Sequence, residues 1–490
     1  MTLNKLINVK RLALIGGPLI FIACCLVPAP DGGHPKLLLM GGFTAWMALW
    51  WLTEAVPLAV TSFLPFLILP SSGIIDIREA AAQYMDPILF LFIGGFLIAF
   101  AIERWGLHRR LALHILSATG GSVSSILLGV MVTAFILSMW ISNTATVMMM
   151  LSAVLAVIQH LKAPLENEET HRKVASALMT GLAYSATIGG MATLVGTPTN
   201  MIFLKSYSEH YSQSHPVTFL SWMALALPLA IVLLIITWKV IRMVTLRKYA
   251  ALPFEKQLFR KELGLIGKWN ADEKIVFLVF LTAAILWFTR SGIETESFRF
   301  TGWASLLPYP DQIHDSTVAI GAALLLFLIP SRTEKGRTLL TWNEASRIPY
   351  EIILLFGSGF ALAKGFDTSG LSNYISGQLH FLKEVNVVLV ILGICLTVTF
   401  ISEFASNVAS IQLVMPILIS LQSALDIDPR LLLLPAALAA SNGFMLPVAT
   451  APNTIAFSTG HIRVSEMAAT GFFTNLAAIL LITVACLLLA

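Results

Sequence analysis

The chain has 490 residues, of which 57% are hydrophobic and only 12% carry a charge. Soluble domains carry about 25% charged residues, so this composition excludes an ordinary soluble protein. The net charge of +4 comes from basic residues in the segments between apolar runs, and it does not indicate nucleic-acid binding. Many apolar runs reach the roughly 20 residues that a membrane-spanning helix needs. The sequence therefore predicts an all-α polytopic membrane protein.

Three apolar segments before Asp86 are expected to form membrane helices: Leu12–Val27, Leu37–Trp51 and Leu58–Leu69. Basic residues precede the first of them, so the positive-inside rule places the N-terminus in the cytoplasm. Pro57 is expected to end or kink the second helix, because proline cannot donate a backbone hydrogen bond. Glu54 stands at this boundary and is interpreted as a structural residue at the membrane edge.

The next part of the chain alternates helices with interruptions. Asp86–Ile102 is apolar and rich in glycine, and it is expected to form a re-entrant hairpin. Residues 103–116 predict an amphipathic helix at the membrane interface, with its basic residues toward the lipid head groups. An apolar run at 126–158 follows and has a polar interruption. After the polar loop Lys162–Lys173, the helix Val174–Leu194 is rich in small residues and should pack closely.

A basic loop separates the two halves of the chain. It follows the predicted span Trp222–Ile241, and between Lys239 and Lys274 there are nine Lys or Arg residues against four Asp or Glu. Such a loop is expected in the cytoplasm. The apolar segments Ile275–Phe288 and Val318–Ile329 predict two further spans.

The last part of the chain is expected to repeat this pattern. Its apolar segments are Ile352–Ala363, Gly365–His380, Val387–Ile401, Ile411–Leu421, Leu431–Pro447 and Phe472–Leu489. The whole chain would then contain about 11 transmembrane helices plus two re-entrant hairpins. Because hairpins and crossings look alike in sequence, an inverted relation between the two halves is a hypothesis at this point.

One polar cluster occurs twice within the apolar segments. Ser138–Thr146 contains a Ser-Asn pair, and Ser402–Ser410 contains the same pair at the same place. The offset that places Asn143 on Asn407 also places Gly106 on Gly370. Irregular backbone at membrane depth is tolerated only where protein or a water-filled cavity surrounds it.

A second pair of motifs follows the two clusters. Gly196–Asn200 resembles Ala449–Asn453, with a slightly shorter offset than that of the clusters. Interrupted apolar segments in corresponding halves of a membrane protein are the best sequence pointer to the binding site of a transporter. Ser441-Asn442 lacks the matching serine and its counterpart is Ile188-Gly189, so we interpret that pair as contacts between helices.

The clusters supply neutral oxygen atoms and the ends of half-helices. Oxygens of this kind suit an alkali cation, and the N-terminal end of a half-helix attracts an anion. The first cluster contains no carboxylate, and the second contains only Glu403, so a proton relay is weakly supported. Neither cluster contains Lys or Arg. An anionic substrate would need a bound cation, which is the coupling that a symporter requires.

At these residues the chain resembles the divalent anion/sodium symporter family, which includes bacterial and animal di- and tricarboxylate transporters. The resemblance covers nearly the whole chain, and its motifs are highly specific in combination. They are Thr53–Pro57, Ser142–Thr144, Gly196–Pro198, Ser406-Asn407 and Leu446–Asn453. The resemblance implies an inverted-repeat fold, a homodimer in the lipid bilayer, and an elevator-type movement of a transport domain against a scaffold.

The resemblance also implies the residues of the site. The first sodium site would use Ser138, Ser142, Asn143 and Gly196, and the second would use Ser402, Ala405, Asn407 and Ala449. The carboxylate substrate would contact Asn143, Thr144, Thr197, Pro198, Ser406, Asn407 and Thr450. The chain departs from the family at Val408, where the signature has a threonine, so its substrate size and preference stay open.

Four regions are expected on this basis. Residues 1–85 would form scaffold helices, and residues 86–215 would form the first repeat of the transport domain. Residues 216–345 would add scaffold helices and the cytoplasmic basic loop. Residues 346–490 would form the second repeat and the C-terminal helix.

The predicted function is sodium-coupled import of C4-dicarboxylates such as succinate, malate or fumarate, across the plasma membrane of a bacterium. A sodium-independent exchanger of di- or tricarboxylates is the alternative, since the family contains both. The sequence has no zinc-protease motif, phosphate-binding loop or nucleophile elbow, so we do not expect an enzyme. The sequence leaves open the sodium:substrate ratio and the resting conformation.

Overall fold

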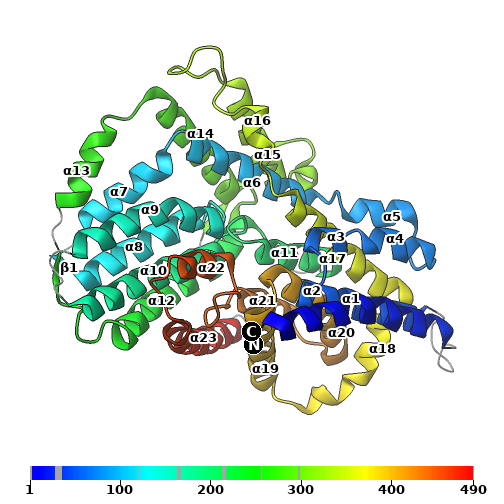
Figure 1. Ribbon diagram of the computed structural model, residues 1–490. Coiled ribbons are helices and arrows are strands. Elements are labelled where there is room, and N and C mark those ends of the chain that lie inside the picture. Colours follow the sequence, from blue (N-terminus) through cyan, green and yellow to red (C-terminus); the bar gives the residue numbers. More distant parts are fainter. Residues whose placement is uncertain are drawn as a thin grey trace.

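The computed structural model describes residues 3–27, 36–119, 121–162, 167–211, 217–254, 257–295 and 298–488. Nearly all regular structure is α-helical, as expected from the composition (Figure 1). In the described residues, three short 3₁₀ helices and two short antiparallel strand pairs complete it. The strand pairs are β1 (Gly121–Ser122) with β2 (Pro253–Phe254), and β3 (Ile293–Thr295) with β4 (Phe298–Phe300).

The first half of the chain contains helices α1 to α12. Their bounds are α1 Leu3–Leu26, α2 Leu37–Thr53, α3 Leu58–Thr61, α4 Leu64–Ser71, α5 Ile77–Gln83, α6 Pro87–Arg104, α7 Leu107–Ala118, α8 Val123–Ser138, α9 Asn143–Lys162, α10 Glu168–Met191, α11 Pro198–Tyr211 and α12 Phe219–Val244.

The second half contains helices α13 to α23. Their bounds are α13 Gln257–Ile266, α14 Ala271–Thr289, α15 Asp315–Leu328, α16 Trp342–Ala345, α17 Tyr350–Ser369, α18 Leu371–Gln378, α19 Val387–Phe404, α20 Asn407–Leu425, α21 Arg430–Ala440, α22 Ala451–Ser458 and α23 Val464–Leu487.

The described residues include eight helices that are long and apolar enough to cross a membrane, and five shorter apolar helices. Large apolar side chains are exposed on several of them, for example Leu12 on α1, Leu328 on α15 and Leu389 on α19. Lipid tails are as apolar as these side chains, so such exposure is expected in a bilayer. The expected hairpin within Asp86–Ile102 is wrong, because α6 runs without a turn from Pro87 to Arg104. The number of crossings stays a prediction.

The helix α10 lies at the centre of the fold, where its spanning segment is completely buried. Its small Gly, Ala, Ser and Thr side chains let α8, α9 and α12 pack closely against it. The close packing expected for Val174–Leu194 is confirmed. The polar loop before it is shorter than expected, because α10 already begins at Glu168 and is capped by Asn167. Residues 163–166 of this loop lie outside the described residues.

A separate hydrophobic cluster holds the N-terminal helices to the second half of the chain. On α2, Met40, Phe43, Met47 and Trp51 recur at helical spacing and are buried. They belong to one cluster with apolar residues of α4, α17 and α18, such as Phe366. The region expected as a scaffold, residues 1–85, therefore packs against the beginning of the last region.

The structure corrects three expected helix bounds. The segment Leu58–Leu69 is divided into α3 and α4. The segment Leu431–Pro447 is helical only to Ala440, and residues 441–450 form a loop instead. The segments Ile352–Ala363 and Gly365–His380 are wrong as separate elements, because α17 runs through both to Ser369. Leu362 and Phe366 continue the buried stripe of α17, and this packing outweighs the helix-weakening effect of the glycine between them.

The turn after α17 occurs at a glycine that the sequence spacing had already singled out. Gly370 has φ of 79°, and Gly106 after α6 has φ of 73°. Both are left-handed conformations that glycine adopts without the steric cost of a Cβ atom. The two helix pairs α6–α7 and α17–α18 thus turn at matching positions.

The expected region boundaries fall at different kinds of places. The boundary at residue 86 coincides with Asp86, whose carboxylate accepts a hydrogen bond from the Ile88 amide and caps α6. The boundary at 345–346 coincides with the end of α16. The boundary at 215–216 lies outside the described residues. The division into four regions stays a prediction.

The helix α7, expected at the membrane interface, takes part in a buried ion pair. The Arg110 guanidinium donates to the Glu273 carboxylate on α14 at 3.0 Å, and both side chains are buried. Arg110 also donates to the carbonyls of Gly267 and Lys268. The expectation that the basic residues of this helix all face lipid head groups is therefore wrong for Arg110. Arg109 pairs with Glu262 at the surface instead.

We predict that Arg110→Ala lowers the thermal stability of the purified protein strongly. The substitution leaves the Glu273 carboxylate buried without its partner, which costs about 3–5 kcal/mol. Arg109→Ala is the matched control, because an exposed pair contributes about 0–1 kcal/mol. Melting curves in detergent check this. Equal melting temperatures for the two variants would show that the buried pair does not stabilise the fold.

Candidate functional site

The first Ser-Asn cluster forms a tip where one helix ends and the next begins. The helix α8 ends at Ser138, and α9 begins at Asn143. The Ser138 hydroxyl donates to the side-chain oxygen of Asn143 at 2.7 Å. The Ser142 hydroxyl accepts a hydrogen bond from the Ala145 amide at 3.3 Å and caps α9. We call residues 138–144 the first tip.

The second cluster has the same construction. The helix α19 ends at Phe404, and α20 begins at Asn407. The Ser402 hydroxyl donates to the side-chain oxygen of Asn407 at 2.8 Å. The Ser406 hydroxyl accepts from the Ala409 amide at 3.2 Å. We call residues 402–408 the second tip; its two polar contacts repeat those of the first tip in the register found in the sequence.

Both tips present the N-terminal end of a long helix. Only one amide in the first turn of each helix is bonded to the capping serine, and the remaining amides give the end a partial positive charge. Ser142, Asn143, Ser406 and Asn407 are half-buried. The tips therefore combine accessible oxygen atoms with backbone donors, and no lysine or arginine occurs in either tip.

A glycine loop packs against the first tip. The side-chain nitrogen of Asn200 donates to the backbone carbonyls of Gly190 and Thr193, at 3.1 and 2.7 Å. An added Cβ atom on Gly190 would lie 2.3 Å from the Asn143 side-chain oxygen. An added Cβ atom on Gly196 would lie 2.5 Å from the Gly190 carbonyl oxygen. Asn143 and Gly196, both expected in the first sodium site, thus contact the same residue.

The loop beside the second tip repeats these contacts at the equivalent positions. The side-chain nitrogen of Asn453 donates to the backbone carbonyls of Gly443 and Leu446, at 2.9 and 3.0 Å. An added Cβ atom on Gly443 would lie 3.0 Å from the Ala449 Cβ atom and 3.3 Å from the Ser402 carbonyl oxygen. Residues expected in the second sodium site therefore gather around Gly443.

At the site, one helix of each half packs against helices of the other half. The helix α11 packs against α20 and α21, while α22 packs against α9 and α10. Figure 1 shows α11, α21 and α22 in the middle of the molecule, between α8–α10 and α20. The Thr199 and Ser441 hydroxyls are hydrogen-bonded at 3.0 Å across this contact. Each tip is thereby enclosed partly by the opposite half of the chain.

The structure places the remaining expected substrate residues at helix starts. Thr450 is buried, and its hydroxyl caps α22 by accepting a hydrogen bond from the backbone N–H of Asn453 at 3.2 Å. Thr197 is buried before α11, which begins at Pro198. Thr144 and Val408 are half-buried in the first turns of α9 and α20. No hydrogen bond within the described ranges joins the first tip directly to the second.

The Glu403 side chain holds the loop at residues 441–450, beside the second tip, in place. Its buried carboxylate accepts from the amides of Met445 and Leu446, at 2.8 and 3.0 Å, and from the Asn475 side chain at 2.6 Å. The Tyr184 hydroxyl holds the same loop through the Phe444 carbonyl. These contacts fix the chain between α21 and α22 beside the tip.

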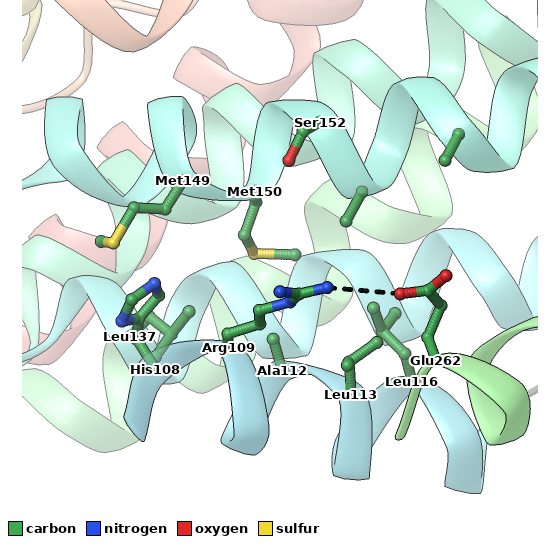
Figure 2. A pocket seen from close by; sticks show the side chains of 12 residues that line it. His108, Arg109, Ala112, Leu113, Leu116, Leu137, Met149, Met150, Ser152 and Glu262 are labelled. Atoms are coloured by element: carbon green, nitrogen blue, oxygen red, sulfur yellow. Dashed lines mark hydrogen bonds and ion pairs between the residues drawn. The ribbon is translucent and has the colours of Figure 1, made fainter. Parts of the chain in front are cut away.

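Two cavities in the described part of the chain are lined by no residue of either tip. A cavity of about 510 Å³ lies between α7 and α9, where Met149 and Met150 face His108 and Arg109 (Figure 2). A second cavity of about 420 Å³ contains the ion pair between Lys205 and Asp86. The first is mainly apolar, so it offers few donors for a small dianion. Chemistry, rather than cavity volume, identifies the tips as the candidate site.

Sequence reasoning missed several residues that build the site. Gly190 and Gly443 provide the space beside the tips, and Asn200 and Asn453 hold the loops with their amides. The sequence offset already connected Asn200 with Asn453, and extending it upstream pairs Gly190 with Gly443. No sequence signal indicated Asn475, which reaches Glu403 from α23.

Comparisons with known proteins agree with this geometry. A family model described as the sodium:sulfate symporter transmembrane region matches residues 8–489. The chain belongs to this family. The family resemblance seen in the sequence motifs is confirmed, and transport rather than catalysis is the activity that the family supports.

Curated relatives cover the same length. The chain is 40% identical over 485 residues to the sodium-dependent dicarboxylate transporter SdcS of Staphylococcus saprophyticus, covering 98% of this chain and 91% of the relative. It is 40% identical over 480 residues to SdcS of Staphylococcus aureus, covering 96% of this chain and 90% of the relative. The chain is an integral membrane protein, and its bacterial relatives indicate the plasma membrane.

Solved transporters share the fold. The structure is similar to MtrF of Neisseria gonorrhoeae, from a class of antimetabolite efflux pumps, with a TM-score of 0.56, 16% identity, and coverage of 97% of this chain and 94% of MtrF. It is also similar to the YdaH transporter of Alcanivorax borkumensis, with a TM-score of 0.50, 12% identity, and coverage of 98% and 97%. At these identities the likeness concerns the fold alone.

The glycine beside the first tip gives a test of the site geometry. We predict that Gly190→Ala removes most of the stabilisation of the purified protein by sodium, because its Cβ atom displaces the Asn143 side chain. The sodium concentration for half-maximal thermal shift should rise at least about tenfold.

Gly393→Ala on α19 is the matched control, since an added Cβ atom there meets nothing within 4 Å. Its thermal shift should equal that of the wild type. A normal sodium response of Gly190→Ala would exclude Asn143 from cation binding.

Proposed function

We propose that the protein is a sodium-coupled importer of C4-dicarboxylates such as succinate, malate and fumarate. The observation that supports this most is the duplicated tip, in which a serine hydroxyl bonds an asparagine oxygen beside an open helix N-terminus. The family supports sodium as the coupling ion, and the SdcS relatives are named as sodium-dependent dicarboxylate transporters.

In this proposal each tip binds one sodium ion through neutral oxygens. Ser138, Ser142, Asn143 and the Gly196 carbonyl would hold the first ion, and Ser402, Asn407 and the Ala405 and Ala449 carbonyls would hold the second. The packing of Asn143 and Gly196 around Gly190 supports the first set. The packing of Ser402 and Ala449 around Gly443 supports the second.

The dicarboxylate would lie between the tips, against Asn143, Thr144, Thr197, Pro198, Ser406, Asn407 and Thr450. Amide groups at the starts of α9 and α20 and threonine hydroxyls would donate to its two carboxylates. Two bound sodium ions would balance its two charges, because the tips carry no basic side chain. Substrate binding would thus require sodium, and the requirement is mutual by linkage.

The matching hydrogen bonds of the two tips and of the two loops support a duplicated architecture. We propose that residues 86–215 and 346–490 are inverted repeats that form a transport domain, with the two helix pairs that turn at Gly106 and Gly370 as hairpins. This domain would move as an elevator against scaffold helices of residues 1–85 and 216–345, in a homodimer. Mass photometry in nanodiscs tests the homodimer, and a monomer mass would contradict it.

The uptake of labelled succinate into proteoliposomes tests the proposed function. We expect accumulation with an inward sodium gradient and none with an equal potassium gradient. Asn143→Ala should abolish the sodium-driven uptake, while Asn386→Ala at the start of α19 should retain it. Sodium-independent uptake that requires dicarboxylate inside the vesicles would instead establish an exchanger.

Val408 is expected to influence the choice of substrate. It is half-buried in the first turn of α20, where a threonine would add a hydroxyl beside the second tip. We predict that Val408→Thr changes the ratio of succinate to citrate uptake by about threefold or more while the sodium dependence stays unchanged, since one hydrogen bond contributes roughly 1 kcal/mol.

Val388→Thr near the start of α19 is the control for the added hydroxyl, and it should leave the substrate ratio as in the wild type. A change in sodium dependence alone at Val408→Thr would place residue 408 beside the cation instead of the substrate.

A further inference from the structure

Four carboxylates are buried in the described part of the chain: Asp272, Glu273, Asp315 and Glu403. Glu273 and Asp315 each pair with an arginine. Asp272, at the head of α14, accepts four hydrogen bonds from the loop at 331–333. Glu403, like Asp272, has only neutral donors and no ion pair between described residues. It differs from Asp272 because the side chain that donates to it, Asn475, keeps a buried oxygen without a partner.

The surroundings of Glu403 contain more acceptors than donors. Asn475 uses its amide nitrogen to donate to Glu403, and the oxygen of the same amide has no hydrogen-bond partner. Asn475 is 5% exposed and Glu403 is 4% exposed, so water reaches neither freely. Asn453, just after the loop that Glu403 holds, also has a buried side-chain oxygen without a donor, while Asn442 in that loop lacks partners for both its side-chain oxygen and its side-chain nitrogen.

A buried carboxyl group beside an unpaired oxygen is stabilised either by protonation or by a positive partner. An isolated charge is costly in an apolar interior, and buried charges are paired or coordinate a cation. Hydrogen bonds from neutral groups lower this cost but leave the charge in place. The geometry points to a cation at Glu403, held by its carboxylate and the side-chain oxygen of Asn475.

We propose that this cation is sodium, bound in addition to the two ions at the tips. Hard cations take oxygen ligands, and a single carboxylate balances one positive charge, so the site suits a monovalent ion better than a divalent one. The inference rests on the proposed function, because it takes sodium as the ion that the protein binds.

The position of Glu403 gives this ion a coupling role. Glu403 follows Ser402 of the second tip, and its carboxylate holds the loop before α22. A cation here balances the negative charge of the Glu403 carboxylate and thereby stabilises the loop that carries Ala449. The counterpart of Glu403 in the first tip is Met139, which has no charge. The additional ion therefore belongs to the second half only.

Equilibrium binding of ²²Na⁺ to the purified protein, without dicarboxylate, tests the proposal. We expect Glu403→Gln to bind one sodium ion fewer per chain than the wild type. Glutamine keeps an oxygen for the Met445 or Leu446 amide, and its own amide supplies a donor for Asn475, so the variant should fold. Its melting temperature in potassium buffer should fall slightly, because one of the two backbone amides loses its acceptor.

Asn475→Ala provides a second variant that keeps the carboxylate, and it should lose the same ion at sodium concentrations that saturate the wild type. Glu262→Gln, which alters an exposed pair with Arg109, should bind as many ions as the wild type.

The outcomes separate this inference from the proposed function. Equal sodium counts for wild type, Glu403→Gln and Asn475→Ala would overturn the additional site while leaving the two tip sites intact. A wild type that binds no sodium would overturn both the additional site and the proposed function. A count that falls by one in both variants and stays unchanged in Glu262→Gln would establish the site.

Discussion

The structure depends on how a helix can be interrupted inside an apolar environment. Four amides at the start of a helix lack partners within it, and lipid cannot supply them. At both tips, a serine caps the new helix and a second serine bonds an asparagine oxygen. The interruption is stabilised by small polar side chains of the tip itself. In the proposed site, the oxygens of the same side chains would bind a cation, and the amides at the helix starts would bind an anion.

The loops beside the tips extend this principle. Asn200 and Asn453 each use one amide to hold two or more carbonyls of a loop, and glycine lets each loop approach a tip closely. The helix α22 of the second half packs on α9, which begins at the first tip, and α11 of the first half packs on α20, which begins at the second tip. Each tip is therefore supported by a helix of the opposite half. In the proposed mechanism, a binding site between the halves would then respond to both sodium ions at once.

The sequence located the two helix interruptions more accurately than several helix bounds, while the ligands of the site stay predictions. Serine and asparagine are rare enough in apolar runs that their repetition at fixed spacing marks both tips. The end of α17 was misjudged because packing of Leu362 and Phe366 outweighs the local effect of glycine. The roles of Arg110 and Glu403 depend on Glu273 and Asn475, which are distant in sequence and become neighbours only in the fold.

Calorimetric titration of succinate into the purified protein, in sodium and in potassium buffer, tests the central claim most directly. If sodium at the tips supplies the positive charge that the substrate needs, succinate binds in sodium buffer and shows no measurable binding in potassium buffer. Succinate binding of equal affinity in both buffers would contradict the account, because the tips would then hold the dianion without a cation.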